Sequence, residues 1–154
     1  MTEKELIRKT ENKLKMYELM KINYNNITDD ILKLETKKDS PSSAILSDMP
    51  RARRGDTGDF RLLKVIELIN KKKSLQSRLE AEIMEIERSI KSIKDDRYFF
   101  IIEEYYIKNN TIQSIISNHF ISRVTFFNHR NRLLKKLGFV LYPEVFVEFS
   151  INYI

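Results

Sequence analysis

The sequence predicts an all-α fold, in which a long, coiled-coil-like helical hairpin precedes a small helix-turn-helix domain with a short C-terminal extended tail. The chain of 154 residues contains only three glycines and three prolines, so interruptions of helices are rare. Over two long stretches, apolar residues recur at steps of three and four, the spacing of one face of an α-helix. Sheet is therefore expected to be a minor part of the fold.

The first stretch predicts an amphipathic helix from Leu6 to about Glu35, with Lys and Glu between the apolar positions. Within it, Asn25 and Asn26 precede Thr28, which is a suitable N-cap. The pattern therefore allows a kink at this point of the helix.

The periodicity stops between 37 and 59, where two of the prolines and two of the glycines predict a loop. A second helix is expected from Phe60 to Lys94, and its narrow apolar stripe, flanked by charges, is typical of a coiled-coil seam. Two such helices joined by a loop are most simply an antiparallel hairpin, although pairing between two chains would bury the same stripes. The first predicted domain is thus a helical hairpin over 1–95.

The second predicted domain, 96–154, begins with short, aromatic-rich helices. A helix is expected over Asp96–Tyr106, followed by an exit turn at 108–110. Thr111 and Ser122 are placed to cap the next two helices, and Gly138 to end the last one in a left-handed conformation. This arrangement is a three-helix domain that contains a helix-turn-helix.

The tail from Val145 to Tyr153 alternates apolar and polar residues, which predicts a strand. Because an exposed strand of this kind invites aggregation, we expect it to pack on the domain or to pair with a second copy. A dimer contact through the tail is one consequence.

Charge favours a polyanionic partner for the second domain. The formal net charge is +6, and between Arg97 and Gly138 seven Lys or Arg stand against two Glu. In a helix-turn-helix, the second helix enters the major groove, where Arg can bridge guanine, Asn can bridge adenine, and hydroxyls reach phosphates. The predicted contacts to double-stranded DNA are Thr111, Ser122, Arg123, Thr125, Asn128, Arg130 and Arg132.

Two alternatives stay open from the residues alone. Basic residues near a helix C-terminus also stabilise the helix dipole, so the same segment suits a plain helical bundle. Phe127 is expected either at the rim of the core or exposed toward a thymine methyl group. In the loop, Arg51, Arg53 and Arg54 could contact phosphate or a protein partner, or lie in a solvated turn.

Catalysis is not expected, because the chain has no Cys, two His, and no spacing typical of a metal site or a phosphate-binding loop. No cofactor is predicted. The N-terminus has no apolar leader and no run is apolar enough to span a bilayer, so we expect a cytoplasmic protein without membrane contact.

The order of these motifs resembles a known family. The pair Tyr105-Tyr106, a polar turn, a Ser cap and the string VTFFNHRNRLLKKLG resemble region four of bacterial sigma factors. Together with the loop SSAILSDMPRARRG, the layout is similar to the phage-encoded late-gene regulators of the RinA and ArpU type. The resemblance implies a transcriptional activator of phage or prophage late genes, acting in the cytoplasm of a bacterial host. It also implies that the hairpin dimerises or contacts RNA polymerase. The alternative function is a coiled-coil adaptor that binds only protein partners.

Overall fold

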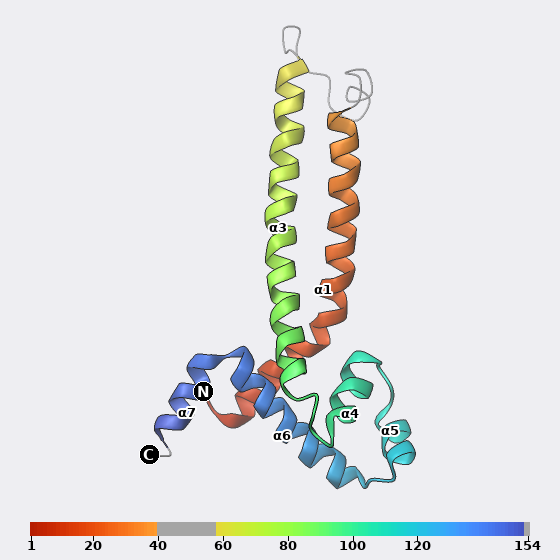
Figure 1. The fold of residues 1–154 in the computed structure, drawn as a ribbon, viewed down its shortest axis with the longest axis vertical. Coiled ribbons are helices and arrows are strands. Elements are labelled where there is room, and N and C mark those ends of the chain that lie inside the picture. The colour runs from red at the N-terminus through yellow and green to blue at the C-terminus, as the bar shows by residue number, and fades with distance from the viewer. Residues whose placement is uncertain (40–57, 153–154) are drawn as a thin grey trace. The chain divides into compact units, whose positions relative to one another are not determined.

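In the computed structural model, which describes residues 1–39 and 58–152, every regular element of these ranges is a helix (Figure 1). The all-α prediction is confirmed. In chain order, the elements are α1 (Glu3–Lys38), α3 (Gly58–Ser92), α4 (Phe99–Ile102), the π-helix η1 (Glu103–Ile107), α5 (Ile112–His119), α6 (Arg123–Leu141) and α7 (Pro143–Ile151).

The chain forms two compact units, one made of Met1–Leu19 with Ile83–Ile154 and the other of Met20–Glu82. Each long helix therefore contributes to both units. The region 96–154, predicted as a domain, shares its unit with the first turns of α1 and the last turns of α3.

In the unit Met20–Glu82, α1 and α3 lie side by side as a hairpin (Figure 1). The amide of Gln76 donates to the Thr28 hydroxyl at 2.8 Å, and Leu34 packs against the buried Val65 and Ile69. Because later residues of α1 meet earlier residues of α3, the two helices are antiparallel, as expected.

The sequence allowed a kink at Asn25 to Thr28, but α1 continues through this stretch as one regular helix. The Thr28 hydroxyl donates to the Tyr24 carbonyl oxygen at 2.9 Å. Since the side chain bonds within its own helix, it does not cap a new one.

The helix predicted over Asp96–Tyr106 begins later and changes from an α-helix to a π-helix. It starts at Phe99, and Lys108 N–H donates to the Glu103 carbonyl at 2.9 Å, the five-residue spacing of a π-turn. The exit turn is where the sequence placed it, with Asn109 in the left-handed region at φ 56°.

Gly138 does not end α6, contrary to the sequence prediction. It lies inside the helix, which continues to Leu141. A Cβ atom at this position would lie 2.7 Å from Thr10 Oγ1 and 2.8 Å from Leu6 Cγ. The glycine is therefore explained by the close approach of α1 to α6 rather than by a left-handed turn.

The predicted C-terminal strand is wrong, because Pro143–Ile151 is the helix α7. Pro143 is its first residue, where a fixed φ and a missing N–H are well tolerated. Phe146 and Phe149 are three residues apart, and both ring centroids lie 5.4 Å from that of Phe139. Helical winding brings both rings to α6, so the tail packs on its own unit.

Candidate nucleic-acid interface

Helices α5 and α6 form a helix-turn-helix whose two start sites are capped as predicted. The Thr111 hydroxyl accepts from Ser114 N–H at 3.1 Å, and the Ser122 hydroxyl accepts from Thr125 N–H at 3.0 Å. The Ser122 hydroxyl also donates to the Thr125 hydroxyl at 2.8 Å. A phosphate contact by the hydroxyl of Thr111 or Ser122 would thus compete with the cap that this hydroxyl forms.

A small aromatic core fixes α6 against the preceding helices. Phe126 is fully buried together with Ile101 and Ile115, and the Tyr105 ring meets it edge-on at 5.7 Å. The π-turn holds Tyr106 inward as well, and its hydroxyl donates to Glu11 at 2.8 Å. Burial and the Glu11 carboxylate both raise the pKa of Tyr106, so this phenol stays neutral at physiological pH.

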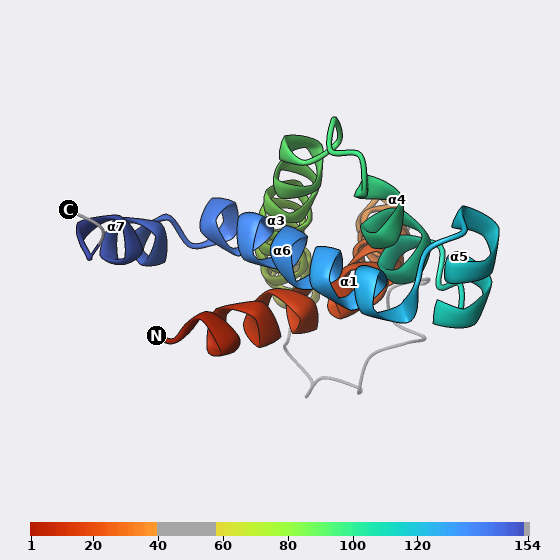
Figure 2. The ribbon, with the colours of Figure 1, turned by 90° about the horizontal axis from the view of Figure 1, so that it is seen from below.

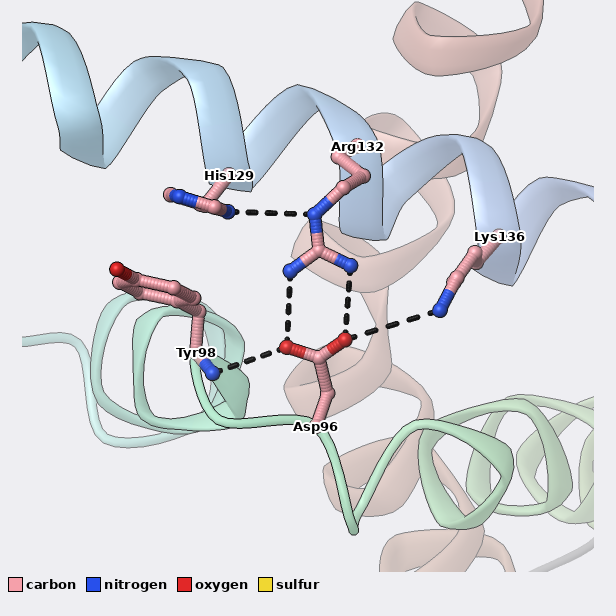
Figure 3. A network of polar contacts seen from close by, with 5 residues as sticks. All are labelled: Asp96, Tyr98, His129, Arg132 and Lys136. Atoms are coloured by element: carbon pink, nitrogen blue, oxygen red, sulfur yellow. Dashed lines mark hydrogen bonds and ion pairs between the residues drawn. The ribbon is translucent and has the colours of Figure 1, made fainter.

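A charged network anchors the middle of α6 to the segment before α4 (Figure 3). Arg132 donates to both oxygens of Asp96, at 2.8 and 2.9 Å, and Tyr98 N–H donates to the same carboxylate at 2.9 Å. Lys136 approaches it at 3.7 Å, and His129 stacks on the Tyr98 ring at 3.6 Å. The bonds from Arg132 in particular hold the pKa of Asp96 well below its usual range.

This network changes what Arg132 can do. The sequence offered Arg132 as a base contact, but its two terminal nitrogens are engaged with Asp96 and its Nε donates to His129. A contact to guanine would require breaking a bidentate charged pair. Arg132 instead anchors α6 to the segment before α4.

Arg123 and Arg130 lie against the ring of Phe127. Their guanidinium carbons are 5.5 and 5.2 Å from its centroid, within the range of cation–π attraction. Phe127 itself is partly buried against the aromatic core, so it is a rim residue. Arg130 also bonds to the Asn131 side chain and lies 3.6 Å from Glu11, whereas Arg123 is exposed.

Four side chains in the first half of α6 are exposed, and we call them the reading face: Arg123, Val124, Asn128 and Asn131. Val124, Asn128 and Asn131 follow a spacing of four and three residues, so they share one side of the helix. Val124 is 69% exposed. Sequence reasoning found Arg123 and Asn128 but missed Val124 and Asn131, although the positions facing away from Phe126 would have identified both.

The turn carries another residue that the sequence did not single out. Phe120 adopts a left-handed conformation at φ 52°, a position that normally favours glycine, and its side chain is 94% exposed. Next to it, His119 contacts Glu104 at 2.5 Å and stacks on Phe100 at 3.7 Å. The turn is thus held by His119 while Phe120 points into solvent.

The predicted loop contacts Arg51, Arg53 and Arg54 lie outside the described residues. Across 1–39 and 58–152, no group of three His, Asp or Glu side chains is arranged to hold a metal ion. Within the same ranges, no helix has the length and apolar character needed to cross a membrane.

Comparisons with family models, with curated proteins and with solved structures give no match to this chain.

Proposed function

We propose that this chain is a sequence-specific double-stranded DNA-binding regulator of transcription that inserts α6 into the major groove. The observation that carries the proposal is the reading face, which combines Arg123 and Asn128, donors suited to guanine and adenine, on a helix held in place by Phe126 and Arg132. Rigid placement matters because base recognition depends on the angle and distance of each donor.

The finer assignment rests on the resemblance to phage regulators. We infer an activator of phage or prophage late genes, acting in the bacterial cytoplasm, with the hairpin of α1 and α3 available for RNA polymerase or for a second copy. A second copy would cover apolar side chains that stay exposed on the unit Met20–Glu82: Ile22, Leu32, Leu63, Leu68 and Leu75.

The function is tested by first selecting the duplexes that bind most tightly from a randomised DNA library. The affinity for the selected duplex and for random DNA is then measured by fluorescence anisotropy at two salt concentrations. We expect nanomolar-range binding to the selected duplex and at least about a thousandfold weaker, more salt-sensitive binding to random DNA. Equal and weak binding to all duplexes would contradict the proposal.

The second candidate is an adaptor that binds protein only. It is favoured by one observation, the exposed apolar pair Phe120 and Val124 at the helix-turn-helix. If Phe120→Ser abolished capture of a protein partner while no duplex was selected from the library, the adaptor function would replace DNA binding.

Dimerisation has a separate test in analytical ultracentrifugation. The wild type is expected to sediment as a concentration-dependent dimer, and Leu32→Lys/Leu63→Lys as a monomer, because two buried charges would oppose the interface. A wild-type monomer at all concentrations would refute the dimer.

A further inference from the structure

A shallow groove lies beside α6 on the unit that contains the helix-turn-helix. It has a volume of about 570 Å³ and is formed between the first turns of α1 and the middle of α6, which lie side by side in Figure 2. The lining residues are Glu3, Lys4, Ile7, Arg8, Glu11, Arg130 and Asn131.

The α1 wall of the groove is ordered from its first residue. Thr2 and Glu5 form a capping box, with Thr2 N–H donating to the Glu5 carboxylate at 2.9 Å and Glu5 N–H donating to the Thr2 hydroxyl at 3.2 Å. Lys4 and Arg8 are four residues apart, so they lie on one side of this helix. Leu6 is fully buried on the other side, which holds the cations in place.

The carboxylates of the groove are already neutralised. Glu3 pairs with Lys135 at 3.1 Å, and Glu11 accepts from the Tyr106 hydroxyl at 2.8 Å and lies 3.6 Å from Arg130. Glu11 is also 3.6 Å from Lys15.

The cations of the α1 wall are in a different state. Across 1–39 and 58–152, neither Lys4 nor Arg8 has an ion pair within 4.0 Å, and both are exposed. The groove therefore presents two exposed positive charges without a close ion pair, of which Arg8 adds to the capping hydrogen bond that lowers the pKa of the neighbouring Glu5.

The groove also continues the reading face, since Asn131 belongs to both. Packed helices lie about 8–10 Å apart, and the major groove of B-DNA is about 12 Å wide. A helix packed on the flank of the recognition helix would therefore lie near the phosphate strand at the edge of the groove. The close approach at Gly138 packs α1 directly against α6.

We propose that this groove binds the DNA phosphate backbone beside the major groove, with Lys4 and Arg8 as the phosphate-contacting residues. The inference rests on the proposed DNA-binding function and deepens it. The first turns of α1 then belong to the DNA interface and set the register of α6 without reading sequence.

The test compares Lys4→Gln/Arg8→Gln with a control of equal charge change, Lys33→Gln/Arg78→Gln, whose two cations are exposed on the unit Met20–Glu82. Affinities for the selected duplex and for random DNA are measured over a series of salt concentrations. Circular dichroism checks that both variants keep the wild-type helix content.

The groove variant is expected to reduce the steepness of the plot of log affinity against log salt by about 1.8, since each phosphate contact contributes about 0.9. At about 0.1 M salt, this corresponds to a loss of roughly tenfold or more, in the same proportion for both duplexes. The control should keep the wild-type slope.

If the wild type prefers its selected duplex but the two variants have the same slope, the groove assignment is wrong and the proposed function stands. A loss confined to the selected duplex would also overturn the phosphate assignment. If the wild type shows no preference for any duplex, the proposed function fails, and this inference fails with it.

Discussion

The charged network that anchors α6 predicts a specific, pH-dependent loss of stability in Asp96→Asn. Asp96 is a partly buried carboxylate, with a side chain 14% exposed, that holds both terminal nitrogens of Arg132. Asparagine has the same shape but only one acceptor oxygen and no charge. Its oxygen can take the place of Oδ1, which accepts from Tyr98 N–H and from Arg132 Nη2, but its NH2 group cannot accept from Arg132 Nη1. The bidentate pair is therefore lost.

The magnitude follows from the two charge-assisted bonds. Hydrogen bonds to charged groups contribute about 1.5–3 kcal/mol each, but the Arg132 side chain is 38% exposed and can be rehydrated. We therefore expect Asp96→Asn to lower the free energy of unfolding by about 1.5–2 kcal/mol. For a chain of this size, the corresponding fall in Tm is about 3–8 °C.

The electrostatic contribution of Asp96 to the free energy of unfolding depends on pH. Because the folded pKa of Asp96 is depressed, its stabilisation is present above the unfolded pKa of about 4 and is lost as the pH falls toward the lowered folded value. The difference between wild type and variant should therefore shrink by about 1 kcal/mol between neutral pH and about pH 3.

Urea denaturation at both pH values measures this effect, followed by far-UV circular dichroism and by the fluorescence of the tyrosines around the aromatic core. The control is Glu103→Gln, which removes a surface pair with Lys108 at 3.8 Å and should cost less than about 0.5 kcal/mol. An Asp96→Asn variant as stable as Glu103→Gln, or a difference unchanged in acid, would refute the anchoring role.

Three further changes test the local packing. Gly138→Ala gains about 1 kcal/mol of helix propensity but forces a Cβ atom against Thr10 and Leu6, so calorimetry should show a net destabilisation of about 1 kcal/mol. In Leu6→Ala/Gly138→Ala, the total loss of stability should be smaller than the sum of the two single losses, and simple additivity would contradict the contact. Phe120→Gly should raise the free energy of unfolding, measured by urea titration, by about 0.5–1 kcal/mol, because glycine adopts the left-handed conformation without strain. A lower free energy of unfolding would show that the exposed ring contributes to the stability of the fold. Ser122→Ala should cost about 1 kcal/mol through the lost cap, whereas Ser122→Asp should retain most of the stability.

Local sequence signals predicted the elements that depend on local bonds. The caps at Thr111 and Ser122 and the exit turn at Asn109 form bonds between residues close in the sequence, and all three lie where expected. The hairpin was also predictable, because its apolar stripes have a helical period. These features need no knowledge of tertiary contacts.

The errors arise where distant residues decide the structure. Gly138 looks like a helix terminator until Leu6 is known to pack against it. In the tail, the alternation of apolar residues concealed a helical pair, Phe146 and Phe149, whose partner Phe139 lies on α6. A strand and a helix explain such a short apolar segment equally well until this contact is known.

The candidate site was predicted only in outline for the same reason. Arg123 and Asn128 were identified by residue type and position on the helix. The engagement of Arg132 was not, because its partner Asp96 is 36 residues away in the sequence and nothing local links the two. Residue type alone cannot distinguish an arginine that contacts DNA from one that anchors the contacting helix.

The most direct test of the central claim is the affinity of Arg123→Ala/Asn128→Ala for the selected duplex and for random DNA at about 0.1 M salt. Arg132 is left unchanged, so the anchor of α6 stays intact, and Arg78→Ala/Asn25→Ala provides an exposed control of the same residue types. If α6 reads DNA, the double variant loses about a hundredfold for the selected duplex, about 1–3 kcal/mol per bidentate contact, and far less for random DNA. A variant that keeps the wild-type preference for the selected duplex would contradict the account.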